Sequence, residues 1–313
     1  GEARAARGGD SEMEPAAASL AEPPEARPAD SVARAAPLGG LPSEADVVRA
    51  LCEQEPDLRG FEQLDKWRRC EREAGSCLVY AHNLARAENN GLPSSLECGK
   101  AAGLGTHEVA ALLGWTTGDF RFLNPIARGL PEVTFEDYPK GAKAACTLSR
   151  PEVLPYVQVL SSALRRLPPA AEAQTLWRGH RRPVPSEVGS VLCFRGFTSA
   201  SYNRDESLVF AAQPNAGRSA RRSLLAIQEH LSGRNISRYS ARKREAEVLF
   251  PLDACFEVMA HGGSAEADAA AAEAEAAALR LGEQVPGAEI RVVYLREVSR
   301  EAAAGRAEAL AAY

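Results

Sequence analysis

The sequence contains no uninterrupted apolar run of about 18 residues, which is the length that a membrane-spanning helix needs. No membrane span is therefore expected. It also lacks a basic surplus, because 37 Lys and Arg residues stand against 42 Asp and Glu, for a formal net charge of −5 at pH 7. Phosphate-binding domains usually carry an excess of basic residues, so this balance argues against a nucleic-acid partner.

Metal-binding patterns are absent as well. None of the cysteines forms a Cys-x-x-Cys pair and the histidines show no ligand spacing, so no metal site is expected. Four of the seven cysteines gather in one region, which suits one or two disulfides of a secreted protein and equally the ordinary thiols of a cytosolic one: Cys52, Cys70, Cys77 and Cys98. The chain starts with Gly1 and shows no signal-type apolar run, so we expect a processed or truncated form, and earlier removal of a signal peptide stays open. Secreted and cytoplasmic locations both stay open.

The first half of the chain divides into a tail and a helical region. Residues 1–44 are rich in Ala, Pro, Glu, Arg and Gly, and they are too poor in large apolar residues to offset the entropy of ordering, so they predict a disordered tail. Residues 45–104 carry apolar residues at helical spacing among charges and predict a helical N-terminal region. A short helix with Thr106 as N-cap follows, and 151–167 is the clearest helix, with Pro151 in its first turn.

After residue 173 the pattern changes to short segments rich in Val, Leu, Ile and aromatics, separated by Gly, Pro, Asn or Ser. Strands that follow a group of helices predict the α+β class. Two further segments stand apart from this pattern. Residues 264–283 are an Ala/Glu-rich insert, expected to form a solvated helix, and residues 299–313 predict a C-terminal helical tail.

Two glutamates one residue apart, Glu245 and Glu247, begin the segment EAEVLFP. If this segment is a strand throughout, both carboxylates lie on one face, about 6–7 Å apart, while Val248 and Phe250 face the core. Like charges at that distance raise each other's pKa unless a cation or a hydrogen bond stabilises them. On spacing alone, an edge strand with glutamates facing water is the simpler interpretation, so the motif by itself is weak.

Two other segments carry polar groups at predicted strand ends. TLWRGH places Arg178 beside Gly179, which offers a guanidinium and a bare backbone to a phosphate or carboxylate, although a surface arginine is the simpler interpretation. GFTSAS brings Ser199 and Ser201 after Phe197. These hydroxyls suit an ordinary turn, and they equally suit the orientation of a ligand or of a glutamate.

The order Arg, then Phe-x-Ser-x-Ser, then Glu-x-Glu resembles the arginine-specific branch of the mono-ADP-ribosyltransferase family. The resemblance extends to LLGWTTGDFRFLNPIARG, YVQVLSSALRRLP with LWRGH, and GRNISRYSARKREAEVLFP, and it covers about residues 105–260, with 289–298 fitting less firmly. It implies a catalytic domain at 105–298, with a mixed, mostly antiparallel two-sheet β core that holds a cleft for NAD.

The resemblance also implies a role for each matching residue. Arg178 would hold the NAD pyrophosphate, Gly179 would admit the adenosine half, and Ser199 would support the catalytic glutamate, Glu247. Glu245 would select an arginine side chain as acceptor. One departure is that Ala200 stands where the family often has Thr. The implied enzyme is an NAD–protein-arginine ADP-ribosyltransferase, a monomer that uses NAD as substrate, needs no metal and acts on a protein partner.

The chemistry of the implied reaction fits these residue types. Cleavage of the nicotinamide–ribose bond produces an oxocarbenium-like sugar, which a fixed carboxylate stabilises. An NAD glycohydrolase and a catalytically silent interaction domain remain as alternatives. Among the loop residues, Arg218, Arg221 and Arg222 either meet NAD phosphates or form a solvated charge run, and Tyr239 either packs on an acceptor arginine or within its own loop.

Overall fold

The computed structural model describes most of the chain from residue 99 onward. The described residues are 50–51, 53–54, 99–135, 146–171, 173–213, 221–240, 242–281, 289–304 and 310–312. The predicted tail at 1–44, most of the predicted helical region at 45–104, its four cysteines and Arg218 lie outside them.

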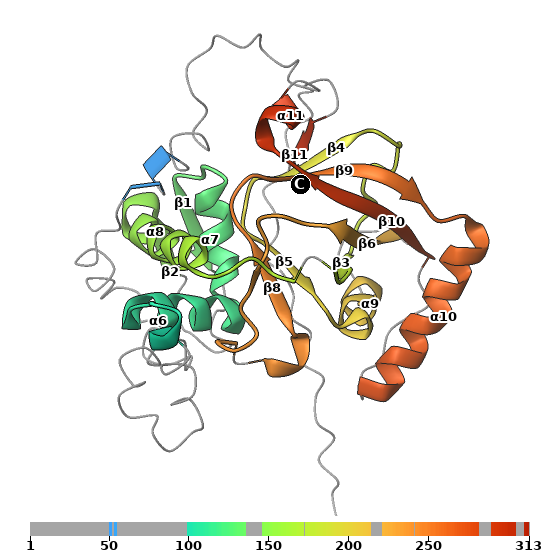
Figure 1. Cartoon of the computed structure of the whole chain (residues 1–313), viewed down its shortest axis with the longest axis horizontal. Coiled ribbons are helices and arrows are strands. Elements are labelled where there is room, and N and C mark those ends of the chain that lie inside the picture. The colour runs from blue at the N-terminus through green and yellow to red at the C-terminus, as the bar shows by residue number, and fades with distance from the viewer. Residues whose placement is uncertain are drawn as a thin grey trace, which may run out of the picture. The chain divides into compact units, whose positions relative to one another are not determined.

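Three helices form the first group of elements (Figure 1): α6 (Thr106–Gly114), α7 (Phe120–Ala127) and α8 (Arg150–Arg166). The predicted helix at 151–167 is confirmed as α8, and Ser149 with Glu152 forms a capping box at its start. The predicted N-cap of α6 is wrong by one residue. Gly105 is the N-cap, and its backbone N–H donates to Glu108 Oε2 at 2.8 Å.

Strands dominate the second half of the chain, and the α+β class is confirmed. A two-stranded ribbon, β1 (Glu132–Phe135) with β2 (Cys146–Ser149), accompanies the helices. The main sheet has the order β11-β4-β9-β10-β6-β3-β5-β8-β7. Its strands are β3 (Leu176–His180), β4 (Val191–Phe194), β5 (Thr198–Ser201), β6 (Arg221–Glu229), β7 (Arg234–Asn235), β8 (Glu247–Phe250), β9 (Ala254–His261), β10 (Glu289–Val298) and β11 (Leu310–Ala312).

The pairing of this sheet is mixed and mostly antiparallel, as the sequence predicts. Only β10 with β6 and β4 with β11 run parallel among its pairs of described strands. The expected two sheets are instead connected into one, because β3 and β5 are joined at the single residue pair Trp177–Ser201. That narrow junction separates β5-β8-β7 from the longer strands, and Arg178 and Ser199 lie on either side of it.

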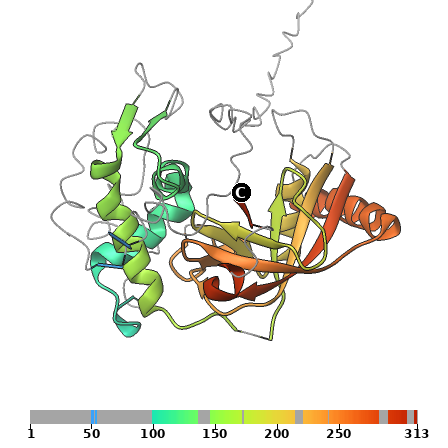
Figure 2. The same ribbon diagram turned by 90° about the horizontal axis from the view of Figure 1, so that it is seen from above.

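Two helices lie against the longer strands (Figures 1 and 2). Helix α9 (Arg204–Ala212) packs on β3 and β6, and α10 (Ser264–Leu281) packs on α9 and β10. The expectation of a solvated insert is only half right, because α10 buries one face of small residues: Ala270, Ala274, Ala277 and Ala278. Alanine allows this close approach of α10 to α9 and the sheet.

Two apolar clusters support the region around Arg178 and Ser199. One joins α6, α7 and α8 to the short strands, with Tyr156, Phe197 and Leu249 among its buried members. The other lies within the sheet and contains Phe250 and Phe256, whose ring centroids are 5.1 Å apart. Polar groups held between these clusters are therefore fixed by packing on both sides.

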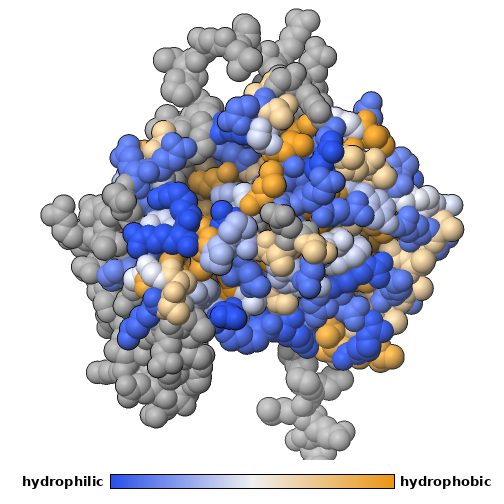
Figure 3. Space-filling view, in the orientation of Figure 1, coloured by the Kyte–Doolittle hydropathy of each residue, from blue (hydrophilic) through white to orange (hydrophobic). Residues whose placement is uncertain are grey.

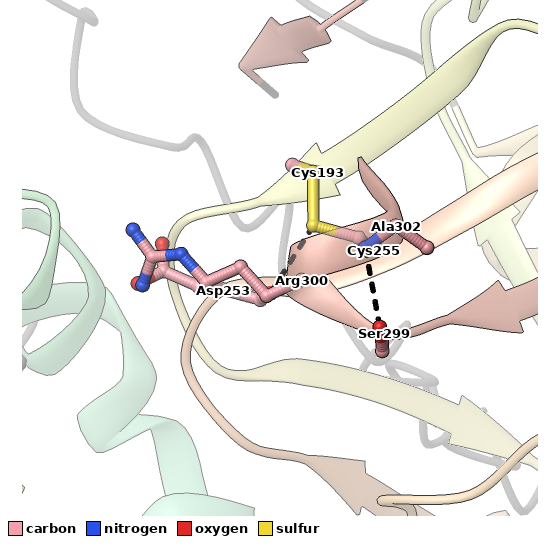
Figure 4. Close-up of a disulfide and its surroundings, with 6 residues drawn as sticks. All are labelled: Cys193, Asp253, Cys255, Ser299, Arg300 and Ala302. Carbon is pink, nitrogen blue, oxygen red and sulfur yellow. Dashed lines mark hydrogen bonds and ion pairs between the residues drawn. A yellow bond between two sulfur atoms is a disulfide. The ribbon is translucent and has the colours of Figure 1, made fainter. Parts of the chain in front are cut away.

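The end of the chain corrects the predicted helical tail at 299–313. Helix α11 covers only Arg300–Ala304, and Leu310–Ala312 forms strand β11 beside β4. Close by, Cys193 of β4 and Cys255 of β9 are direct cross-strand partners and form a disulfide (Figure 4). The sequence analysis did not pair these two cysteines. Asp253, two residues before Cys255, forms an ion pair with Arg300 at 3.3 Å.

The face seen in Figure 1 is covered largely by hydrophilic side chains, and hydrophobic residues appear there as small, scattered groups (Figure 3). In the part of the chain that the structure describes, no helix combines the length and the apolar character that crossing a membrane requires.

Candidate active site

Arg178 occupies the middle of β3 and points its guanidinium toward β5. Its Nη1 donates to the Ser199 carbonyl oxygen at 2.6 Å, and its guanidinium carbon lies 5.6 Å from the Phe194 ring centroid. Its enclosed Nε has no hydrogen-bond partner among the described residues. Burial and the nearby charge of Arg128 lower the pKa of Arg178 to about 10, which leaves it cationic at neutral pH.

Ser199 connects this arginine to a carboxylate. Its carbonyl oxygen accepts from Arg178, while its hydroxyl donates to Glu247 Oε1 at 2.5 Å. Strands β5 and β8 pair in antiparallel register, with Ser201 opposite Glu247, which brings these side chains to the same part of the sheet. The structure therefore brings Arg178, Ser199 and Glu247 together from three separate segments of the chain.

Glu247, the first residue of β8, is a buried carboxylate with only 5% of its surface exposed. Burial raises its pKa to about 7, and Glu245 adds to the rise, while hydrogen bonds from Ser199 and Trp115 and the charge of Arg178 oppose it. Both of those hydrogen bonds end on Oε1. Oε2 is buried and has no partner among the described residues, so one oxygen remains to accept a hydrogen bond from a ligand.

Trp115 is the site residue that sequence reasoning missed. Its indole Nε1 donates to Glu247 Oε1 at 2.8 Å and lies 3.3 Å from Ser199 Oγ. It begins a π-helical turn, Trp115–Asp119, whose end is held by a 2.7 Å hydrogen bond from Tyr156 Oη to Asp119 Oδ2. The sequence analysis used its segment for the resemblance, but no local pattern distinguishes this tryptophan from a core aromatic.

Asn124 of α7 is a second residue that the sequence analysis did not single out. Its Nδ2 donates to the Phe197 carbonyl oxygen at 3.1 Å, which fixes the turn that leads into β5. A side chain on Gly196 would come 2.6 Å from Asn124 Oδ1, so this glycine leaves room for the close approach of Asn124. Asn124 Oδ1 is buried and has no hydrogen-bond partner among the described residues.

The position of Glu245 corrects the alternation argument. Glu245 ends a 3₁₀ turn, Lys243–Glu245, and is not part of the strand, which begins at Glu247. Ala246 between them has φ of 44°, in the left-handed region that a non-glycine residue rarely adopts. Strand alternation therefore does not place the two carboxylates on one face of the sheet. The charge of Glu245 still raises the pKa of Glu247.

Glu245 is more open to solvent than Glu247, with 34% of its side chain exposed. Burial raises its pKa, and the nearby Glu206 has the same effect, while Arg242 and Arg244 lower it. Arg242 Nη1 lies 3.2 Å from Glu245 Oε1. The Glu245 carboxylate therefore already pairs with a guanidinium of its own chain.

Two residues that the sequence analysis considered for ligand binding also make structural contacts. A side chain on Gly179 would come 2.2 Å from the Ser207 carbonyl oxygen, so this glycine allows α9 to pack on β3. Its contact with a ligand stays a prediction. Arg222 is buried and donates to the carbonyl oxygens of Ala211 and Ala212 at the end of α9.

Arg221 pairs with Glu289 at 3.2 Å, across the parallel strands β6 and β10. Tyr239 is buried in the helical cluster, which is the loop-packing alternative for this residue. No group of three or more His, Cys, Asp or Glu residues that would suit a metal occurs among the residues that the structure describes.

The chain matches no protein family model and no curated protein.

It is similar to several solved structures at low identity. Vis, an ADP-ribosyltransferase toxin from Vibrio splendidus, is 19% identical with a TM-score of 0.42, over 63% of this chain and 75% of Vis. Plx2a, an ADP-ribosyltransferase toxin from Paenibacillus larvae, is 15% identical with a TM-score of 0.40, over 69% of this chain and 96% of Plx2a. The type III effector XopAI from Xanthomonas axonopodis pv. citri is 18% identical with a TM-score of 0.36, over 83% and 84%.

Proposed function

We propose that this protein is a mono-ADP-ribosyltransferase that moves ADP-ribose from NAD to arginine side chains of proteins and releases nicotinamide. The observation that carries the proposal is the connected set Arg178–Ser199–Glu247. A cationic guanidinium and a carboxylate whose second oxygen has no partner among the described residues are held on the two sides of a single serine. NAD has a pyrophosphate that the guanidinium can bind and a ribose that the carboxylate can contact.

Each group has a defined task in this reaction. Arg178 binds the pyrophosphate, and its unpartnered Nε supplies a donor that the folded chain leaves unused. Glu247 Oε2 accepts a hydrogen bond from the nicotinamide ribose and stabilises the positive charge that develops on it as the C–N bond breaks. Trp115 and Ser199 hold Oε1, so the carboxylate does not rotate away from the sugar.

The ionised form of Glu247 is the one that stabilises the developing charge. Its pKa of about 7 means that the free enzyme is only partly ionised at neutral pH. Bound NAD brings the positive nicotinamide ring to the site, which favours the carboxylate and lowers this pKa. Substrate binding therefore favours the ionised form of Glu247, which burial alone disfavours.

Glu245 supports transfer to arginine over simple hydrolysis. A carboxylate binds a guanidinium through two parallel hydrogen bonds, and the pair with Arg242 indicates that Glu245 is accessible to such a group. Water needs no anchor of this kind. An NAD glycohydrolase would use Arg178, Ser199 and Glu247 but would leave Glu245 without a task.

Incubation with NAD labelled in its adenosine part, together with agmatine as a free guanidinium acceptor, tests the proposal. Transfer yields labelled ADP-ribosyl-agmatine and one nicotinamide per adduct. Free ADP-ribose alone would identify a glycohydrolase. Unchanged NAD after prolonged incubation would favour the catalytically silent domain and would overturn the proposed activity.

A further inference from the structure

Glu206 lies in the first turn of α9 and forms an ion pair with Arg244, the residue that precedes Glu245 in the 3₁₀ turn. The two ends of this pair differ in exposure, because 14% of the Glu206 side chain and 55% of the Arg244 side chain reach solvent. A carboxylate this enclosed depends on a cationic partner for its charge. Glu206 and Arg244 therefore form an ion pair directly beside the carboxylate that we assign to the acceptor.

The backbone of this turn is held by hydrogen bonds that do not involve Glu206. Three successive carbonyl oxygens, those of residues 244–246, accept hydrogen bonds from the segment 201–203 at the end of β5. The donors are Asn203 Nδ2 to Arg244, the Ser201 hydroxyl to Glu245 and the Tyr202 N–H to Ala246. Loss of the Glu206 charge should therefore leave the turn in place and change only its electrostatics.

Four charged side chains gather around this turn as two ion pairs. Arg242 Nη1 lies 3.2 Å from Glu245 Oε1, and Arg244 pairs with Glu206. Burial is the main cause that raises the pKa of Glu245, while the charges of Arg242 and Arg244 lower it and that of Glu206 raises it. Both members of the second pair are thus close enough to Glu245 to affect its charge, and they act in opposite directions.

We propose that Glu206 determines the affinity for the acceptor by neutralising Arg244 beside Glu245, an inference that rests on the proposed function. An arginine acceptor brings one more guanidinium to a turn that already carries those of Arg242 and Arg244. With Glu206 ionised, the two ion pairs have no net charge, and Glu245 attracts the acceptor. Without the charge of Glu206, the positive charge of Arg244 repels the acceptor and competes with it for Glu245.

Glu206 has no task in the cleavage of NAD itself. Its partner Arg244 belongs to the acceptor turn, whereas Arg178 and Glu247 are both bonded to Ser199. Hydrolysis of NAD by water should therefore not depend on Glu206. Removal of its charge should weaken the binding of agmatine, which appears in the KM for agmatine and not in kcat.

The test uses the full chain and measures transfer from labelled NAD to agmatine and, without agmatine, hydrolysis of NAD, each at low and at high salt. Glu206→Gln keeps the size of the side chain but removes its charge, and it should raise the KM for agmatine by about fivefold at low salt. Because salt screens exposed charges, this increase should shrink at high salt. NAD hydrolysis by the same variant should stay at the wild-type rate.

Two further variants separate charge from structure. Arg244→Gln, added to Glu206→Gln, removes the uncompensated cation and should return the KM for agmatine to about the wild-type value. Asp205→Asn is the matched control, because it breaks the neighbouring ion pair of the same helix turn, with Arg280 of α10 at 2.7 Å. This control should keep the wild-type KM for agmatine.

The outcomes separate this inference from the proposed function. Labelled agmatine with an unchanged KM in Glu206→Gln would overturn the inference and leave the transferase activity standing. A raised KM that persists in the double variant, or that is the same at high salt, would also overturn it, because Glu206 would then act through structure and not through charge. Loss of NAD hydrolysis in Glu206→Gln would have the same consequence. If the wild type labels no agmatine, the proposed function fails and the inference fails with it.

Discussion

Trp115 Nε1 and Glu247 Oε1 lie 2.8 Å apart although 132 positions of sequence separate them. This hydrogen bond joins the helical part of the chain to the first residue of β8. It acts against the burial that raises the pKa of Glu247. Trp115 is therefore a positioning residue that affects both the orientation and the charge of the proposed catalytic carboxylate.

Replacement of Trp115 by Phe removes this donor and keeps most of the aromatic packing with Phe197. Because a hydrogen bond that favours the charged form is lost, the pKa of Glu247 should rise further. We expect the midpoint of the kcat/KM pH profile to move up by about one unit. Trp177→Phe on β3 is the control and should keep the wild-type midpoint. An unchanged midpoint in Trp115→Phe would contradict the role of the indole.

Glu247 also links folding stability to pH. Its pKa is about 7 in the folded protein, against an ordinary value of 4.5 for an exposed glutamate, so the folded state keeps a proton that the unfolded state loses. Stability should therefore fall as the pH rises from about 4.5 to about 7 and then level off, by up to about 3 kcal/mol. Urea unfolding across this range measures the slope. Glu247→Gln carries no titrating group here, and a slope equal to the wild type would exclude this residue as the cause.

Glu247→Gln should abolish transfer while it leaves NAD binding largely intact. The amide keeps the size of the side chain but loses the charge that stabilises the oxocarbenium-like ribose, at a cost of roughly two to three decades in rate. Nicotinamide release measures turnover, and calorimetry measures NAD binding. Near-native turnover in this variant would show that another group is the catalytic carboxylate.

Glu245→Gln should separate the two possible fates of ADP-ribose. The amide loses the charge that binds an arginine acceptor, while Arg178 and Glu247 remain in place. We expect agmatine modification to fall by about tenfold or more while NAD hydrolysis continues. Both products are measured in one reaction by chromatography. Equal loss of the two activities would contradict the assignment of Glu245 to the acceptor alone.

The Cys193–Cys255 disulfide closes a segment with a sequence separation of 62 residues between β4 and β9. Loss of such a crosslink increases the conformational entropy of the unfolded chain. The double variant Cys193→Ser with Cys255→Ser should therefore have a free energy of unfolding that is lower by about 2–4 kcal/mol. The measurement is the urea concentration at the unfolding midpoint, with and without reductant. The wild type with reductant should match the double variant. Identical midpoints with and without reductant would show that the bond adds no stability.

The sequence predicted the parts of the site that depend on residue type within regular strands. Arg178 and Ser199 lie on predicted strands, and the residues that follow Glu247 are buried as expected. Helix α8 was predictable because its apolar residues recur at helical period. The α+β class followed from the succession of short apolar segments after a group of helices, and the family resemblance implied the mixed sheet, but neither predicted its single connection at Trp177–Ser201.

What the sequence did not predict depends on contacts between distant segments or on rare backbone conformations. The strand alternation assigned to Glu245 fails at Ala246, because a left-handed alanine has no sequence signal comparable to that of glycine. The position of Trp115 at Glu247 depends on how α6 and the turn after it dock onto β8. The Cys193–Cys255 pair depends on the register of β4 with β9, which local patterns do not fix.

A crystal structure with a non-hydrolysable NAD analogue tests the central claim most directly. The account predicts that the Arg178 guanidinium contacts the pyrophosphate and that Glu247 Oε2 lies within hydrogen-bond distance of the nicotinamide ribose. An analogue bound at another surface, or a Glu247 carboxylate that faces away from that ribose, would contradict it.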